Sequence, residues 1–371
     1  MRPSEVCSRP EQLAGLVDDW RRLAGVVDGG SYFLTPDWVL GWWEAFGAGR
    51  EAEVAVWRDG SGALAAVAAL LRDGQRLHPR VPLAVPAWSN LGAGAGAADH
   101  CGWPVLPGRA ADVREFLAGR AASASLLLRD LDPQAGVPLV PAGARQVGAS
   151  ACPRLAIPAG GAELELSAKF RKQLRAYGRR LQREGVGFRW VGPERMTESL
   201  LETVFRLHER RWSLRPGRSS FDRGRAGFHR RLIARAGPGR GPAVVLAERD
   251  GRAVGVLYGF CWRDQFAHYQ TGWEPEWAAA NLGTVLVGEA IRLAGLAGAR
   301  VFDFLRGAEP YKYRFGAADR VDETWLLPRG GGGRLLDLRY RLRARLRGSA
   351  AVPPPARDRR TPASGPPPGR S

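Results

Sequence analysis

The sequence contains very little lysine. Lys169, Lys172 and Lys312 are the only lysines among 55 basic residues, and the others are arginine. Lysine presents a compact ammonium and arginine a planar fork, so the two do not substitute freely at a binding site. We interpret Lys312 as a position that requires the compact ammonium; the alternative is chance retention in an arginine-rich sequence.

Long apolar runs and paired cysteines are also lacking. No stretch of about 18 uncharged apolar residues occurs, which argues against a membrane-spanning helix. The four cysteines are scattered without a CxxC pair, which argues against a zinc site and a disulfide framework. The first residues, MRPSEVCSRPEQL, have no apolar segment typical of a secretory signal. We therefore expect a cytoplasmic protein without a metal ion.

A dinucleotide-binding loop is not evident. The glycine-rich run GAGAG at 92–96 lacks the GxGxxG spacing, and no clear helical pattern follows it. We predict a flexible loop there.

The net charge of +18 is unevenly distributed. Residues 167–240 hold 20 basic and 6 acidic groups, and residues 329–371 hold 11 arginines against two aspartates. The remainder of the chain is therefore slightly acidic. Two local positive fields of this kind suit polyanions, acidic lipid headgroups or the phosphates of a cofactor.

The most informative segment that is present is FDFLRGAEPYKYRFG at 302–316. It begins as an apolar strand, turns at a glycine and then gathers carboxylates, arginines, a lysine and tyrosines within a dozen residues. Such a concentration at the carboxyl end of a strand is typical of a ligand or reaction site. The alternative is an ion-pair cluster that braces a turn.

Two hairpins indicate an internal repeat. Asp59-Gly60 and Asp250-Gly251 each separate two apolar strands, and an Arg-Asp pair lies at the same distance beyond each turn. Asp-Gly between apolar runs is a strong hairpin signal. Two copies of one αβ unit explain the pattern, although a single repeated spacing is also compatible with coincidence.

The second half of the chain has a clear order of elements. The spacing of apolar residues predicts a basic helix from Ser167 to Gly185 and a second helix that begins at Thr197. Strands are expected at about 243–249, 252–261 and 265–273, then a helix at 282–297 and a strand at 300–305. A final strand near 321–327 is expected to close the sheet.

The last part of the chain is basic. LLDLRYRLRARLR, after four glycines, fits a helix better than a strand, and we expect it to dock on the protein or to lie on an acidic membrane surface. The Pro/Ser/Arg-rich segment 348–371 is expected to be disordered. We therefore divide the chain into units at 1–160 and 161–328, a basic amphipathic segment at 329–347 and a tail at 348–371.

The order of elements in the second half resembles the GNAT acyltransferase fold. Particular segments are similar to the CelD/BcsL branch of that superfamily, which is linked to cellulose or exopolysaccharide production, and more distantly to Fem-type peptidyltransferases. These segments are FLTPDW at 33–38, SAKFRKQLRAYGRRLQREG at 167–185, LHERRW at 207–212, YQTGWEPEWAAANLG at 269–283 and FDFLRGAEPYKYRFG at 302–316. The resemblance implies an α/β (α+β) protein of tandem GNAT-like units, each with a mixed, mostly antiparallel sheet flanked by helices.

The resemblance also implies a cofactor site. In the GNAT fold, acetyl-CoA or another acyl-CoA enters a gap between two strands, and its pyrophosphate lies at a helix amino terminus. The matching positions here are Asn281, Gly283 and Thr284, with Tyr269 or Gln270 and Arg306 nearby. We expect Tyr269 and Gln270 to face opposite sides of the strand. An ordinary capped helix is the alternative, because only one glycine of the usual loop remains.

Acyl transfer requires a base, oxyanion donors and often an acid for the thiolate. The base candidates are His208, Glu309 and Asp303; a core histidine and a simple salt bridge are the alternative explanations for the first and last. Tyr311 or Tyr313 matches the position of the tyrosine that protonates the thiolate in GNAT enzymes. Lys312 and Arg306 are expected to hold an anionic group.

These observations predict an N- or O-acyltransferase acting on a small-molecule or glycan acceptor, a hydroxyl or amine of a polysaccharide or cell-envelope precursor. Nucleic acid is not expected as a partner unless the protein uses aminoacyl-tRNA in the manner of Fem-type enzymes. A third alternative is a non-catalytic partner of a polysaccharide synthase.

Overall fold

The computed structural model describes residues 2–78, 81–135, 139–158, 164–212, 221 and 223–346. The predicted disordered tail at 348–371 lies outside these residues. The strands are β1 (Glu5–Cys7), β2 (Glu51–Arg58), β3 (Leu64–His78), β4 (Val81–Asn90), β5 (Ser125–Leu131), β6 (Arg145–Ala156), β7 (Gly187–Val191), β8 (Gly241–Arg249), β9 (Arg252–Trp262), β10 (Gln265–Trp273), β11 (Val301–Asp303) and β12 (Ala318–Leu327). The α-helices are α1 (Val17–Val26), α2 (Pro36–Phe46), α3 (Ala110–Ala121), α4 (Ala168–Arg183), α5 (Glu198–Trp212), α6 (Arg223–Ala234), α7 (Leu282–Leu296), α8 (Pro310–Arg314) and α9 (Gly330–Leu346).

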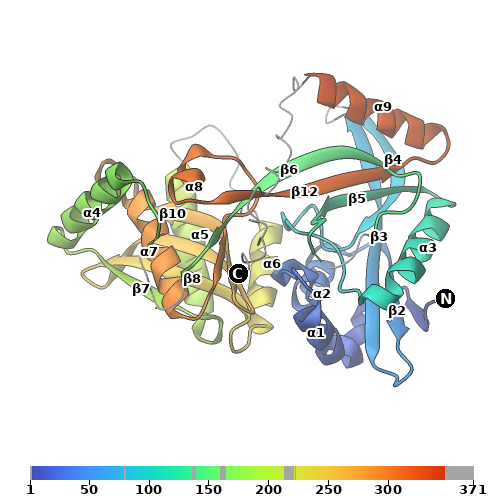
Figure 1. Ribbon diagram of the computed structural model, residues 1–371, viewed down its shortest axis with the longest axis horizontal. Helices are drawn as coiled ribbons and strands as arrows, with labels where there is room; N and C mark the ends of the chain where they lie inside the picture. Colours follow the sequence, from blue (N-terminus) through green and yellow to red (C-terminus); the bar gives the residue numbers. More distant parts are fainter. Residues whose placement is uncertain are drawn as a thin grey trace, which may run out of the picture.

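The strands form one mixed sheet that runs through both halves of the molecule (Figure 1). Their order is β1-β2-β3-β4-β5-β12-β6-β11-β10-β9-β8-β7. When each first-half strand is matched with its second-half counterpart, β1 with β7 and β5 with β11, the order reads the same from both edges. The sheet therefore shows the internal repeat that the two hairpins predict.

Each half contains the same set of connections. The hairpins β2–β3 and β8–β9 are antiparallel, and each leads to a strand that pairs parallel with the next one after a helical crossover. The crossover helix is α3 between β4 and β5, and α7 between β10 and β11. A parallel pair requires such a long connection, whereas an antiparallel pair needs only a turn.

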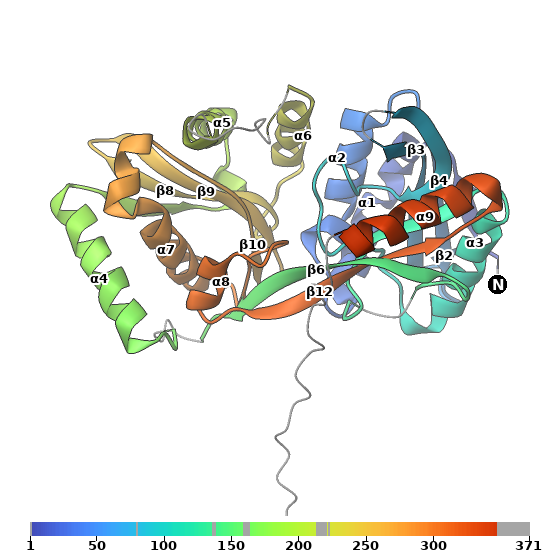
Figure 2. The same cartoon turned by 90° about the horizontal axis from the view of Figure 1, so that it is seen from above.

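The halves exchange their last strands. β6 follows β5 in the sequence but pairs with β11, and β12 follows β11 but pairs with β5; the two also pair with each other. Figures 1 and 2 show these two long strands crossing from one half to the other. The expectation that the strand near 321–327 closes the sheet was therefore wrong, because β12 lies in the middle. The division of the chain near residue 160 stays a prediction, but the two units share one sheet.

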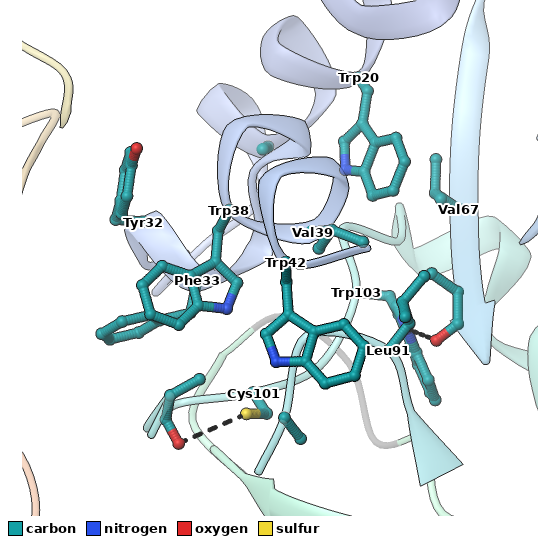
Figure 3. Packing of buried hydrophobic residues seen from close by; sticks show 14 of the residues in the cluster. Trp20, Tyr32, Phe33, Trp38, Val39, Trp42, Val67, Leu91, Cys101 and Trp103 are labelled. Carbon is teal, nitrogen blue, oxygen red and sulfur yellow. Dashed lines mark hydrogen bonds between the residues drawn. The ribbon is translucent and has the colours of Figure 1, made fainter. Parts of the chain in front are cut away.

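Aromatic residues fill the first-half core (Figure 3), and some of them also contact the second half. The Thr35 hydroxyl caps α2 by accepting from the Trp38 N–H, and Pro36 occupies the first turn, where its missing N–H costs nothing. The Trp38 indole contacts Phe33 at a centroid distance of 4.7 Å, Phe228 of α6 at 4.8 Å and Phe260 of β9 at 5.5 Å. The halves are therefore packed against each other through a continuous apolar core.

Helices cover both faces of the second-half strands. Figure 2 shows α5 and α6 on one face and α4 and α7 on the other. Ser167 caps α4 as predicted, and Phe170 and Leu181 bury its apolar side. α7 is the most deeply buried of these helices, because apolar residues occupy nearly its whole circumference.

The basic segment after the glycines forms α9, which contacts β3, β4 and β6. Leu336 is fully buried in a cluster with Ala87, Leu127 and Leu326. The helix is therefore docked on the sheet. Among the described helices, none combines the length and apolar character that a bilayer crossing requires.

Candidate active site

The parallel strands β10 and β11 separate shortly after they meet. They pair only from Gln265↔Val301 to Ala267↔Asp303. Beyond this point β10 continues beside β9, whereas the chain after β11 follows β6 through Phe304 N–H to Pro153 O and Gly307 N–H to Ala151 O. In the described chain, the edge of β10 from His268 to Trp273 therefore has no strand paired to it, and we call this separation of β10 from β11 the gap.

A β-bulge at Tyr269 sets the direction of the side chains beside this gap. His268 pairs with Gly259 and Gln270 pairs with Tyr258, which leaves Tyr269 as an extra residue. Tyr269 consequently contacts His229 of α6, and Gln270 interacts with His208 of α5. The expectation that Tyr269 and Gln270 face opposite sides was wrong, because a bulge breaks the alternation of a regular strand.

The bulge places His268 on the other face, toward α7. Its ring lies 6.0 Å from Phe302 and 6.2 Å from Phe304, and its Nε2 lies 2.5 Å from Thr271 Oγ1. Burial and then the Lys312 and Arg211 charges lower the pKa of His268 to about 3, so the imidazole is neutral at neutral pH. His268 and Thr271 thus line the separated part of β10.

Arg211 reaches the open edge of β10 from α5. It donates from Nη1 to the Thr271 carbonyl at 2.8 Å, and its guanidinium lies 4.0 Å from the centroid of the Trp273 ring. The carbonyl it binds is one that a neighbouring strand would otherwise engage. A positive charge is therefore held at the mouth of the gap.

The amino terminus of α7 lies beside the end of β10. Asn281 has φ 59°, and its carbonyl accepts from the N–H groups of Thr284 and Val285. Among the residues that the structure describes, no side chain caps the helix. Trp273 packs against Gly283, where a Cβ would be 2.8 Å from the indole. The predicted cofactor-binding residues Asn281, Gly283 and Thr284 are thus together at an uncapped helix terminus, with the indole covering one side.

His208 lies on the α5 side of β10 and is fully buried. Neither ring nitrogen makes a well-formed hydrogen bond within the described part of the chain, although the Gln270 side chain lies near the ring. Burial and then Arg211 lower its pKa to about 4, while Gln270 acts in the opposite direction. The helix approaches this strand closely because Gly272 has no side chain: a Cβ there would lie 2.3 Å from the backbone nitrogen of His208. His208 is therefore a neutral imidazole between α5 and β10.

A second buried imidazole accompanies it. His229 Nδ1 lies 2.9 Å from the Tyr258 hydroxyl, and burial, followed by Arg225, lowers its pKa to about 3. The Tyr269 hydroxyl donates to the Gly96 carbonyl at 2.7 Å, in the glycine-rich loop of the first half. Burial raises the pKa of Tyr269. These rings form an aromatic lining under α5 and α6.

Asp303 belongs to a buried ion cluster between the halves rather than to the gap. It accepts from Arg154 Nε at 2.5 Å and lies 2.9 Å from His100 Nε2. His100 Nδ1 lies 2.8 Å from Asp322. Burial opposes ionisation of both groups, but their mutual charges prevail: the pKa of His100 rises to about 10, and His100 and Arg154 hold that of Asp303 below its usual range.

The same cluster brings potential metal ligands together, because ligand atoms of His100, Cys152 and Asp322 lie within 4.8 Å of one another. Both imidazole nitrogens are engaged by aspartates, and burial raises the pKa of the Cys152 thiol, so these groups act as an ion-pair cluster.

Arg306 also joins the halves. It pairs with Asp99 and Asp130, both from the first half, at 2.7 Å each. Burial opposes its charge, but the two carboxylates raise its pKa above the usual range. Within the described chain, the ion pairs of Arg306 are therefore with first-half carboxylates and not with Asn281, Gly283 or Thr284. These contacts do not indicate a role in binding an anionic ligand.

Lys312 braces the turn after β11. Its Nζ donates to the carbonyls of Leu305, Arg306 and Gly307 at 3.1, 3.0 and 2.9 Å, and it lies 2.9 Å from the Glu309 carboxylate. An ammonium has three donors, so these contacts use its capacity. Glu309, with a side chain 54% exposed, is the more accessible member of this pair.

The two tyrosines of α8 have different surroundings although each is 37% exposed. Tyr313 donates to Asp319 at 2.7 Å. Tyr311 lies against Phe304 and shares its electrostatic environment with Arg211; burial and then Glu309 raise its pKa to about 12, while Arg211 lowers it. Tyr311 thus interacts with Arg211 at the mouth of the gap, and of the predicted catalytic residues it is the one that we associate with this site.

The predicted residues therefore fall into five groups. Tyr311 lies by the gap, Asn281, Gly283 and Thr284 lie at the α7 terminus, and His208, Tyr269 and Gln270 lie under α5 and α6. Asp303 and Arg306 belong to the contact between halves, and Lys312 and Glu309 to the turn. Sequence reasoning missed Arg211 and Thr271. The LHERRW and YQTGW segments contain both residues, but only the bulge and the strand separation reveal their contact.

The comparisons with known proteins agree with this geometry. Residues 168–313 match the model of the acetyltransferase (GNAT) domain. That segment includes α4, β10, α7, β11 and most of α8. A search of curated protein sequences finds no match.

Solved structures resemble nearly the whole chain. FemX has a TM-score of 0.57 at 10% identity, covering 87% of this chain and 96% of that chain. The C-terminal domain of an Agrobacterium fabrum protein described as a lysylphosphatidylglycerol synthetase has a TM-score of 0.53 at 13% identity, covering 89% and 96%. A conserved protein of unknown function from Bacteroides thetaiotaomicron has a TM-score of 0.53 at 11% identity, covering 84% and 96%. At these identities the likeness shows the fold, and the predicted GNAT-like fold class is confirmed.

Proposed function

We propose that the protein is an acyltransferase that moves an acyl group from an acyl-CoA to a hydroxyl or amine. The observation that carries the proposal is the separation of β10 and β11 after three residue pairs, beside the uncapped amino terminus of α7. A gap of this kind admits the pantetheine arm of a thioester, and a free helix terminus binds its diphosphate. The GNAT domain match over residues 168–313 supports the same chemistry.

The mouth of the gap carries groups suited to the charges that develop during transfer. Arg211 is a fixed positive charge near the position of a donor carbonyl, where it would stabilise a developing oxyanion. Tyr311 is protonated at neutral pH, because its pKa is raised to about 12, and it would donate a proton to the departing thiolate.

The acceptor would approach from the α5–α6 side. There His208 and His229 are neutral imidazoles, and each has a ring nitrogen that makes no well-formed hydrogen bond among the described residues. His208, which interacts with Gln270, is the base we propose. Asp303, Lys312 and Glu309 are engaged in ion pairs and backbone contacts, which supports positioning roles for them.

The acceptor class follows from the CelD/BcsL resemblance, which points to a polysaccharide or cell-envelope precursor. With acyl-CoA as the donor, the reaction would take place in the cytoplasm. This assignment depends on the sequence segments at 167–185 and 302–316 rather than on the contacts of the gap.

A second candidate is aminoacyl transfer from aminoacyl-tRNA. The exposed side of α4 carries Lys169, Lys172 and Arg179 in a run of basic residues, and this face suits a nucleic-acid backbone. The fold likeness to FemX is compatible with this alternative. A non-catalytic role beside a polysaccharide synthase is a third candidate. It is supported by the backbone contacts and ion pairs that already occupy Lys312 and Asp303.

Calorimetry with acetyl-CoA, longer acyl-CoAs and aminoacyl-tRNA separates these candidates. For the thioester proposal, wild type should bind at least one acyl-CoA at one site per chain. Thr284→Glu should abolish acyl-CoA binding, because it places a carboxylate beside the phosphates. The variant should still fold, because a glutamate in the first turn stabilises a helix. Leu296→Glu is the matched control, since it adds the same charge at the other end of α7, where Leu296 is exposed.

Equal affinity of wild type and Thr284→Glu would overturn the proposed phosphate site. Failure of every thioester, together with tRNA binding that weakens with salt and with Lys169→Glu/Lys172→Glu, would establish the aminoacyl-tRNA alternative instead. Failure of both donors would favour the non-catalytic role.

A further inference from the structure

The outward face of α9 is apolar. Leu335, Leu338 and Leu342 are 48%, 50% and 47% exposed, far more than a leucine in a protein core. Their spacing of three and four residues places them along one side of the helix. They therefore form a continuous stripe, which we call the leucine stripe of α9.

This stripe is not the side by which the helix is docked. Leu336 is fully buried against the sheet, and Tyr340 packs partly against the same cluster. Asp337, also on the inner side, is held in ion pairs by Arg145 and Arg341. The helix thus has two apolar sides, and within the part of the chain that the structure describes only one of them is packed against the sheet.

Arginines flank the leucine stripe on both sides. At about 100° per residue, Arg334, Arg341 and Arg345 lie along one border and Arg339 and Arg343 along the other. Asp337 is the one acidic residue of α9 and is already paired. The outward surface therefore combines an apolar centre with a positive border.

We propose that the leucine stripe of α9 docks on an acidic lipid surface. A helix that lies in the plane of a bilayer buries its apolar side at the boundary between headgroups and acyl chains, and its arginines contact anionic headgroups. The sheet beneath α9 holds the helix in this orientation, so that no folding step is required on binding. The surface is separate from the gap between β10 and β11, and it does not depend on the proposed donor.

Charge argues against the other occupants of this face. In a symmetric contact between two copies, the arginine borders of the two helices would face each other. A nucleic acid would satisfy the arginines but would leave the three leucines in contact with phosphate and water. An anionic lipid surface satisfies both features.

Flotation of the full chain with vesicles tests the proposal. Phosphatidylcholine vesicles with about 30% phosphatidylglycerol should carry the protein, and vesicles of phosphatidylcholine alone should carry much less. Replacing Leu335, Leu338 and Leu342 together by serine should reduce the partition coefficient on the order of tenfold or more. Val26→Ser/Leu296→Ser is the matched control, because it removes exposed apolar residues elsewhere and should leave partition unchanged.

Circular dichroism and urea unfolding verify that the serine variant is folded, since the stripe does not contribute to the docked side. Binding that the serine variant retains would overturn the proposal and indicate attraction by charge alone. Failure of wild type to float with acidic vesicles would overturn it as well. If the wild type formed a dimer that the serine variant lost, a second copy of the chain would replace the lipid surface as the occupant. If both proteins bound single-stranded RNA equally, the occupant would be a nucleic acid.

Discussion

Trp273 packs closely against Gly283: a Cβ at this glycine would be 2.8 Å from two carbons of the indole ring. The tryptophan ends β10, and the glycine belongs to the first turn of α7. Arg211 of α5 stacks on the same indole at 4.0 Å from its centroid. One ring therefore fixes the separated strand, the helix terminus and the positive charge relative to each other.

We expect Gly283→Ala to lower the free energy of unfolding by about 1–3 kcal/mol, because the methyl group would overlap the half-buried Trp273 ring. In an open helix position the same substitution stabilises by up to about 1 kcal/mol. Gly178→Ala in α4 is the matched control, since nothing lies within 4 Å of a Cβ there. Urea unfolding measures both. If Gly283→Ala stabilised the protein as much as Gly178→Ala, the contact between Trp273 and Gly283 would not be tight. If the contact is tight, Gly283→Ala should destabilise the protein less when it is combined with Trp273→Leu.

Lys312→Met should lower the free energy of unfolding by about 2–4 kcal/mol, because it leaves three backbone carbonyls of the turn without their charged donor. Lys312→Arg should also destabilise, since a planar guanidinium cannot donate in the three converging directions of an ammonium. Lys172→Met, on the exposed side of α4, is the control and should stay within about 0.5 kcal/mol. An arginine variant as stable as wild type would refute the requirement for the compact group.

Lys312 also illustrates how far the sequence could be read. Its rarity predicted that a compact ammonium is used there, but three carbonyls that converge on one point are a property of the folded turn. The Asp-Gly hairpins at 59–60 and 250–251 predicted the repeat, because turn chemistry is local. The exchange of β6 and β12 was not predictable, since strand pairing between distant segments leaves no local pattern. The bulge at Tyr269 likewise left no local pattern in the sequence, so the prediction that Tyr269 and Gln270 point to opposite faces of the strand was wrong.

His100 should make stability depend on alkaline pH. Its pKa is about 10 in the folded protein and 6.5 as the usual value, so the folded state holds more protons between these limits. The contribution of His100 to the free energy of unfolding should therefore be largest below about pH 6.5 and should fall as the pH rises toward 10. Unfolding measured at several pH values checks this. His100→Asn should remove that part of the slope and should destabilise at pH 7 by about 3–5 kcal/mol, because Asp303 and Asp322 lose a buried partner.

His78→Asn, at an exposed position, is the control for loss of a histidine and should change the free energy of unfolding at pH 7 by less than about 1 kcal/mol. A slope identical in wild type and His100→Asn would show that the imidazole does not carry a proton between the two aspartates.

Tyr311→Phe tests the catalytic part of the proposed function. If Tyr311 protonates the thiolate, kcat should fall about 100-fold, because a positioned acid contributes at least that much to a transfer step. The free energy of unfolding should change by less than about 1 kcal/mol, since the ring remains against Phe304. Release of thiol from a bound acyl-CoA, with hydroxylamine as a surrogate acceptor, measures the rate.

Tyr313→Phe is the matched control, because it removes a hydroxyl that is equally exposed but bonded to Asp319. It should retain kcat within about twofold. The pKa of Tyr311 is raised to about 12, so loss of its proton does not predict a decline of kcat between pH 7 and 10. Equal rates for Tyr311→Phe and Tyr313→Phe would remove Tyr311 from the mechanism and would leave Arg211 as the charged group at the gap that acts on the donor.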